Sequence, residues 1–138
     1  MIIKALTLYQ PWASFMALGL KPDETRSWAT DYRGPLAIHA AAKIHPDEVS
    51  VDVHHLAFDH FGPWRRWPTG KILCVVDLLE IYTSTGIISN PENIKYALGN
   101  YAKGRQIWAT KMLQVFDEPI PARGYQRLWD WEWEEGEK

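Results

Sequence analysis

The sequence predicts an α+β protein that is mainly β: a small mixed or antiparallel β-barrel with two or three covering helices. Strand-like segments outnumber helical ones, and they do not alternate regularly with helices, which disfavours a doubly wound parallel sheet. Closing a sheet of short strands into a barrel removes its exposed edges. The chain has 138 residues, 46% hydrophobic and 23% charged, as expected for one domain spanning residues 1–138.

The first elements are a strand and a helix. Residues 2–8 are apolar on both faces and predict a covered strand. Gln10 and Pro11 then open a helix, with proline at its first position. Gly19 ends this helix as a C-terminal cap. Three residues recur at helical spacing and should face the core: Trp12, Phe15 and Met16.

Two short strands follow. Residues 24–28 predict a second strand, in which alternation places Glu24, Arg26 and Trp28 on one face. After a Tyr-Arg-Gly-Pro turn, residues 36–40 predict a short apolar strand.

A second helix is expected at residues 46–61, because apolar residues recur there at helical spacing. Asp47 and Glu48 fall in its first turn, where the helix dipole favours negative charge. The loop at 62–70 follows.

The remaining expected elements are a strand at 71–82, a short helix at 91–98, a long strand at 105–116 and a tail at 128–133. The strand at 71–82 is rich in valine, isoleucine and leucine. Pro119 and Pro121 should end the long strand. The tail alternates aromatic and acidic residues, so one of its faces should pack on the body of the protein.

Charge and cysteine content narrow the class of protein. The net charge of −2 argues against a protein that grips long duplexes by neutralising phosphates, but it is compatible with a local basic cleft. Cys74 is the single cysteine, so no disulfide forms within the chain. No apolar run is long enough to span a membrane or to serve as a signal peptide. We therefore expect a cytoplasmic protein without a membrane partner.

The main candidate site is the segment from Lys21 to Arg26. Lys21 lies at the start of a strand whose one face carries Glu24 and Arg26. Repulsion from a neighbouring arginine favours the neutral form of a lysine amine, which can act as a base or nucleophile. Lys21 and Glu24 are therefore the candidate catalytic residues, and Arg26 is a candidate holder of an anionic oxygen. The structural alternative is an ordinary surface ion pair.

Three further residues are candidate ligand contacts. Gln10 has the amide to read a base edge, and Trp12 has a face that can stack on a base; the alternative roles are a helix-start residue and a core residue. His39 lies in an apolar strand and is foremost a core histidine, although it too is kept among the ligand-binding candidates. The spacing of the remaining histidines matches no metal signature, so neither a metal nor a cofactor is expected.

Two segments interleave basic and aromatic residues. They are Trp64-Arg65-Arg66-Trp67 and the cluster of Tyr101, Lys103, Arg105 and Trp108. Either segment has the composition of a patch for single-stranded nucleic acid. A solvated loop with its tryptophans folded inward explains the first equally well, and the second has the same alternative.

Three segments resemble the ASCH (activating-signal-cointegrator homology) domain family: residues 6–13, residues 19–26 as G-x-K-x-x-E-x-R, and residues 33–40. Weaker similarity extends to Trp129. The resemblance implies a PUA-like fold whose cleft binds RNA or nucleotides and places Lys21, Glu24 and Arg26 in that cleft.

The same resemblance implies two alternative activities. Some family members hydrolyse 4-acetylcytidine with the motif lysine as a catalytic residue, and at least one is reported to cut RNA. In the small amidohydrolase members the residue three after the lysine is threonine, whereas here it is Glu24.

The expected function is binding of RNA or of a modified nucleoside in the cleft. Tyr9 or Trp12 would stack on the base, Gln10 and Glu24 would read its edge, and the two cations of the motif would meet phosphate or carbonyl oxygens. The alternatives are an amidohydrolase acting on 4-acetylcytidine-type nucleosides and a metal-independent ribonuclease.

Overall fold

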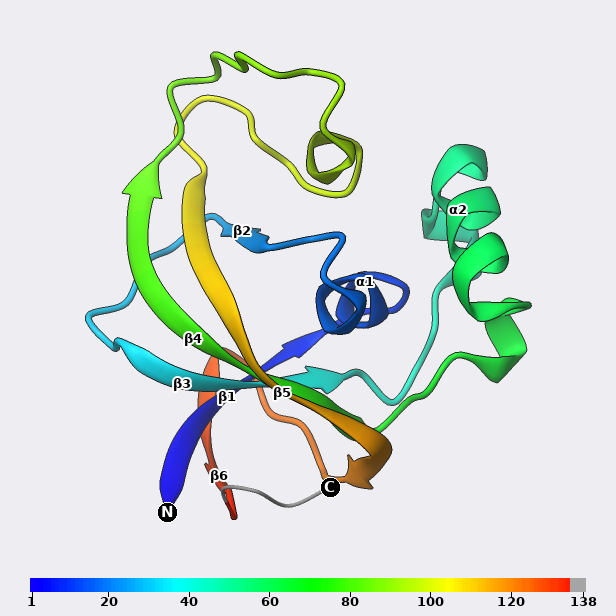
Figure 1. The fold of residues 1–138 in the computed structure, drawn as a ribbon, viewed down its shortest axis with the longest axis vertical. Helices are drawn as coiled ribbons and strands as arrows, with labels where there is room; N and C mark the ends of the chain where they lie inside the picture. Colours follow the sequence, from blue (N-terminus) through cyan, green and yellow to red (C-terminus); the bar gives the residue numbers. More distant parts are fainter. Residues whose placement is uncertain (135–138) are drawn as a thin grey trace.

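A computed structural model describes residues 1–134, which form one mixed six-stranded sheet with helices beside it (Figure 1). The strands are β1 (Ile2–Leu8), β2 (Asp23–Arg26), β3 (Gly34–Ala40), β4 (Lys71–Thr83), β5 (Gln106–Pro121) and β6 (Leu128–Glu132). The helices are α1 (Trp12–Leu18) and α2 (Val51–Phe61), with 3-10 turns η1 (Pro46–Glu48), η2 (Trp64–Arg66) and η3 (Ile94–Ala97). The expected mainly β class with covering helices is confirmed.

The strand order is β2-β5-β4-β3-β1-β6. β1 and β3 are parallel, and the other neighbouring pairs are antiparallel. β4 and β5 are the longest strands. Figure 1 shows that they curve together. The end of β4, the start of β5 and the connection between them lie over β2 and α1.

The expected closed barrel is wrong, because the sheet stays open between β2 and β1. β2 pairs with β5 alone, whereas β1 already pairs with β3 on one side and β6 on the other. On the side of β6, residues 2–6 of β1 therefore have no free backbone edge, and only Thr7 and Leu8, beyond the register with β6, lack a strand partner there. A side chain spans the opening instead: Arg26 Nη2 donates to the Thr7 carbonyl oxygen at 3.1 Å.

The N-terminal half differs from the sequence prediction in detail. β2 ends at Arg26, two residues earlier than expected, and Pro11 is the N-cap of α1. The helix predicted at 46–61 is divided, because Val49 is extended after η1. α2 then starts afresh, with the Ser50 hydroxyl accepting a hydrogen bond from the Val53 amide.

The C-terminal half differs more. The helix predicted at 91–98 is only the single 3-10 turn η3. β5 continues past residue 116 and through Pro119, and it ends at Pro121. β2 covers only the first four residues of β5, so the far end of β5 has one free edge, where a residue without an amide hydrogen is tolerated.

The core has three parts. One lies between α1 and the sheet and contains Trp108, and a second lies on the other side of the sheet under β6, whose Trp129 is buried and whose exposed Asp130 faces solvent. This confirms that one face of the tail packs on the body. The third joins α1 to α2 and contains Phe15 and Trp67. Together they fix α1 and the strand ends around which the site is built.

Leu36→Ala should lower the free energy of unfolding by about 2–5 kcal/mol, because Leu36 is fully buried in β3 and its truncation leaves a cavity. Leu113→Ala is the matched control on β5; with 46% exposure it should cost less than about 1 kcal/mol. Urea unfolding of both variants measures the difference. Equal losses in the free energy of unfolding would contradict the assignment of Leu36 to the core between α1 and the sheet.

Candidate functional site

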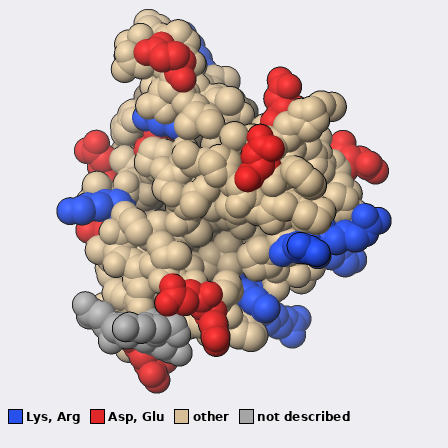
Figure 2. Space-filling view, turned by 45° about the vertical axis from the view of Figure 1, so that its right-hand side comes forward, with Lys and Arg blue, Asp and Glu red and all other residues tan. Residues whose placement is uncertain are grey.

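A cleft of about 620 Å³ opens where β1, α1 and β2 meet the connection between β4 and β5. Its polar lining comes from Lys21, Glu24, Arg26, Asn100 and Arg105, and its aromatic lining from Tyr9, Trp12 and Trp28. Figure 2 shows acidic and basic side chains interspersed around a largely uncharged central area, without one extended basic surface. A cleft of this size and mixed lining is typical of a small-ligand site.

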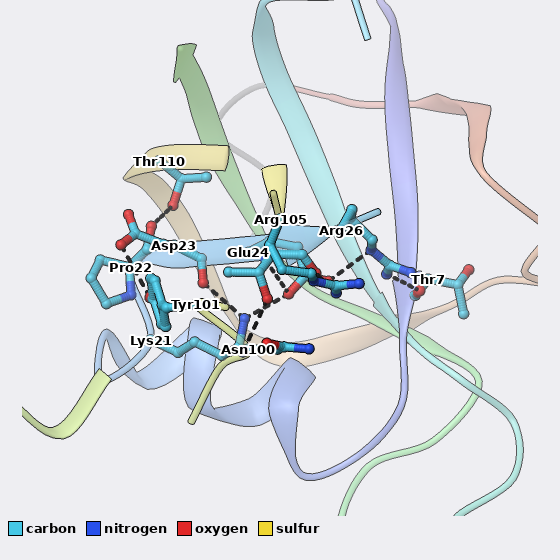
Figure 3. A network of polar contacts seen from close by, with 11 residues as sticks. Thr7, Lys21, Pro22, Asp23, Glu24, Arg26, Asn100, Tyr101, Arg105 and Thr110 are labelled. Carbon is cyan, nitrogen blue, oxygen red and sulfur yellow. Dashed lines mark hydrogen bonds and ion pairs between the residues drawn. The ribbon is translucent and has the colours of Figure 1, made fainter. Parts of the chain in front are cut away.

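The Glu24 carboxylate is the centre of the polar network (Figure 3). Lys21 Nζ donates to Glu24 Oε1 at 2.6 Å and to the Asp23 carbonyl oxygen at 2.8 Å. The Thr25 amide donates to the same Glu24 oxygen at 3.1 Å. Lys21 is only 2% exposed and Glu24 7%, so the pair is buried rather than the surface ion pair that was the structural alternative.

Arg26 approaches Glu24 from the other side. Its Nε lies 2.9 Å from Glu24 Oε2, close enough for an ion pair, although the N–H does not point along a hydrogen bond. The carboxylate thus bridges the two cations. From the sequence we expected Lys21 and Arg26 to lie next to each other and repel. In the structure Glu24 lies between them and forms an ion pair with each.

Local structure explains why the three side chains meet. Gly19 has a φ of 86° and ends α1 in the left-handed conformation, which residues with a Cβ adopt at a cost. The amide of Lys21 then folds back onto the Phe15 carbonyl. In β2 the alternation of the strand places Glu24 and Arg26 on the same face.

Asp23 points to the opposite side of β2 and holds the β4–β5 connection. Its carboxylate accepts hydrogen bonds from Lys95 Nζ at 3.0 Å and from the Tyr101 hydroxyl at 3.1 Å. Burial and the neighbouring Asp23 charge raise the pKa of Tyr101, which therefore stays a donor. Burial alone would lower the pKa of Lys95, but the hydrogen bond and charge of Asp23 outweigh this and raise it.

Two residues of this connection reach the cleft and were absent from the predicted site. The backbone N–H of Asn100 donates to Thr25 Oγ1 at 3.2 Å, and Arg105 Nη2 donates to the Thr25 carbonyl oxygen at 3.0 Å. Figure 3 shows the Asn100 side chain beside the Lys21–Glu24 pair. Arg105 stood in a basic and aromatic cluster of the sequence, which was the available signal; Asn100 gave none.

Of the other predicted contacts, Trp12 lines the cleft and Gln10 does not. Gln10 is 1% exposed, and its amide is bonded within the protein, to Ser14 and to the Pro68 carbonyl. Gln10 fixes the start of α1, and its side-chain amide does not face the cleft.

His39 is a buried histidine whose two ring nitrogens both have partners. Nε2 lies 2.7 Å from the Ala122 carbonyl and must donate to it, so Nδ1 accepts from the Thr7 hydroxyl at 3.1 Å. Thr7 in turn accepts from Trp129 Nε1. Burial lowers the pKa of His39, against the opposing effect of the Ala122 hydrogen bond.

The Trp64-Arg65-Arg66-Trp67 segment forms η2 and adjoins none of the clefts described. Trp67 is buried and donates to the Gly62 carbonyl, while the Arg65 guanidinium lies 4.6 Å from the centre of the Trp64 ring. This is the solvated loop with inward tryptophans that the sequence allowed.

Within residues 1–134, no cluster of metal-ligating side chains is found, and no helix is both long and apolar enough to cross a bilayer.

The chain belongs to the ASCH domain family, whose sequence pattern it matches over residues 6–121. ASCH domains have a PUA-like fold that is generally associated with RNA binding. Over 79 residues the chain is 52% identical to human activating signal cointegrator 1 and 50% identical to the mouse protein. These alignments cover 54% of this chain but 14% of each relative, so the similarity concerns one region of much longer proteins.

The environment of His39 predicts a pH dependence of stability. Because the folded-state pKa is below the ordinary 6.5, the unfolded chain binds more protons as the pH falls below about 6.5, and the free energy of unfolding decreases. His39→Gln should reduce this decrease. Urea unfolding of the unmodified protein and of the variant at pH 7.5 and 5.0 tests this. If the free energy of unfolding decreases equally in both, His39 does not have a lower pKa in the folded state than in the unfolded state.

Proposed function

We propose that this ASCH domain binds RNA or a nucleoside by receiving one unstacked base in the cleft around Glu24. The observation that supports this most strongly is the buried Lys21–Glu24–Arg26 network at the wall of an aromatic-lined cleft. Burying ions costs free energy that their attraction often fails to recover, so such a network is weak evidence for a stabilising device. It suits a binding site, where charged groups must be held in place before the ligand arrives.

The aromatic side chains suit the faces of a base. Tyr9 is 55% exposed and Trp12 is partly exposed, so both have surface to offer. Trp28 is also partly exposed, but its ring is already in contact with the Arg127 guanidinium and with Trp108. Stacking on an aromatic ring contributes about 1–3 kcal/mol per base and tolerates any base. The edge of the base would then face the polar network, which carries the selectivity.

Two guanidinium groups supply unused donors. Arg105 Nε is buried without a hydrogen-bond partner within the described residues. Arg26 Nε lies 2.9 Å from Glu24 Oε2, but its N–H is not directed along a hydrogen bond. Buried donors are rarely left without an acceptor, and those that are invite an explanation such as an absent ligand. A base carbonyl or a phosphate oxygen would supply an acceptor to Arg105 and a better aligned one to Arg26.

The contacts of Lys21 favour binding over hydrolysis. Its amine is 2% exposed and donates to two oxygens, so a nucleophilic or basic role would first require these bonds to break. Incubation with 4-acetylcytidine followed by chromatography separates the two functions. We expect no turnover; turnover that disappears in Lys21→Ala would replace binding with amide hydrolysis.

The double variant Lys21→Met/Glu24→Gln should separate binding from stability. Replacing a buried ion pair with neutral groups of similar shape is often neutral or stabilising. Arg26 loses its carboxylate partner in this variant, but its side chain is 28% exposed and the glutamine amide keeps an oxygen in that position. The free energy of unfolding should therefore fall by less than about 1 kcal/mol. Affinity for a single-stranded RNA octamer should fall at least about tenfold. Urea unfolding and fluorescence anisotropy measure the two quantities.

The matched control is Lys4→Met/Asp130→Asn, which removes the exposed ion pair between β1 and β6 (2.6 Å). It should change neither stability nor binding appreciably. If the double variant at residues 21 and 24 binds the octamer as well as the unmodified protein, the proposed site is wrong.

A further inference from the structure

A second cleft of about 660 Å³ adjoins the first. The two clefts share four lining residues: Thr7, Tyr9, Arg26 and Trp28. The far wall of the second cleft is the β5–β6 connection, residues 122–127. Each volume falls within the range of about 300–1,000 Å³ typical of one small-ligand site. The molecule therefore offers two adjoining ligand-sized spaces, and the Arg26 side chain lines both of them.

The two clefts differ in charge. The first contains the carboxylates Glu24 and Glu48 beside its cations. The second is lined by the guanidinium groups of Arg26, Arg123 and Arg127, with no carboxylate among its lining residues. The lowered pKa of His39, caused by burial, keeps this residue neutral there near pH 7. The second cleft is thus suited to an anion, whereas the first also offers acceptors to the edge of a base.

Aromatic rings hold the guanidinium groups of the second cleft. The Arg127 guanidinium carbon lies 4.2 Å from the centre of the Trp28 ring, and that of Arg123 lies 5.5 Å from the exposed Tyr125 ring. Arg127 has a φ of 58°, a left-handed conformation that is unfavourable for arginine. Backbone strain of this kind is concentrated at functional sites.

The floor of the second cleft is built for close packing. A Cβ on Gly124 would lie 2.6 Å from the His39 ring and 2.7 Å from Thr7 Oγ1, so only glycine fits there. His39 donates to the Ala122 carbonyl at 2.7 Å. This explains the buried histidine as a positioning residue: it fixes the start of the connection that carries Arg123 and Arg127.

We propose that the two clefts form one groove for a single strand of RNA at least two nucleotides long. One base enters the first cleft, the phosphodiester crosses between Arg26 and Arg127, and the next nucleotide lies in the second cleft beside Tyr125. The inference rests on the proposed function and narrows it, because a polymer gains from both clefts and a free nucleoside from one.

The test compares a single-stranded RNA octamer of random sequence with the four free ribonucleosides, which carry no phosphate, by isothermal titration calorimetry. The octamer should bind at least about tenfold more tightly than any nucleoside. Arg123→Gln/Arg127→Asn should remove most of this advantage and leave nucleoside affinity unchanged. Asparagine is chosen because it tolerates the left-handed backbone better than most residues.

Salt dependence gives a readout that a loss of folding would not mimic. For single strands, the slope of log K against log salt concentration becomes shallower by about 0.7 for each phosphate that the protein no longer neutralises. The double variant should show this change. Arg65→Gln/Arg66→Gln removes the same two charges from exposed residues that line neither cleft, and it should keep the unmodified slope.

The outcomes separate the two proposals. Octamer binding that depends on Lys21 and Glu24 but not on Arg123 and Arg127 overturns the extended groove and keeps the first cleft. Equal affinity for the octamer and the free nucleosides also overturns the groove. Binding of neither probe overturns both proposals. An equal loss of octamer affinity in Arg65→Gln/Arg66→Gln would show that overall charge explains the effect, and it overturns the groove as well.

Discussion

The Glu24 carboxylate is the interaction on which the rest of the site depends. One of its oxygens accepts from Lys21 and the Thr25 amide, and the other faces Arg26. Without this anion, Lys21 would be a buried cation with only a carbonyl for a partner, a state that is strongly destabilising. The carboxylate therefore fixes the directions of both cations, and those directions shape the cleft.

The open sheet is what makes room for this arrangement. β1 is paired with β3 on one side and, over residues 2–6, with β6 on the other, so β2 does not join it and is held by β5 and by side chains. Arg26 takes part in both tasks: it pairs with Glu24 and donates to the Thr7 carbonyl across the opening. The two clefts lie on either side of this bridge, so the gap left by incomplete closure is also the place where ligands would enter.

Several features could be predicted from the sequence because they depend on nearest neighbours. Gly19 as a helix cap, the common face of Glu24 and Arg26, and the buried tail tryptophans follow from local periodicity and turn chemistry. Barrel closure could not be predicted, since it depends on which edges of β1 are already occupied. Asn100 could not be found either, because Asp23 and Thr25 bring its loop to β2 across more than seventy residues of sequence.

The glutamine and histidine candidates show that residue type alone does not identify a ligand contact. Gln10 and His39 were plausible ligand contacts by residue type, yet both are buried with their polar groups bonded inside the protein. Residue chemistry indicates what a side chain is able to bind. Only the packing around it decides whether that capacity is used by the protein's own backbone.

The central claim is that the ligand contacts the network around Glu24, and side-chain NMR of arginine tests it most directly. In protein labelled with ¹⁵N-arginine, the Nε–H resonances report on each guanidinium separately. On titration with the RNA octamer, the resonances of Arg26 and Arg105 should shift because the ligand changes the hydrogen bonding of both guanidinium groups, while those of Arg33, Arg65 and Arg66 should stay in place. Shifts confined to Arg65 and Arg66 would contradict the account and move the binding surface to η2.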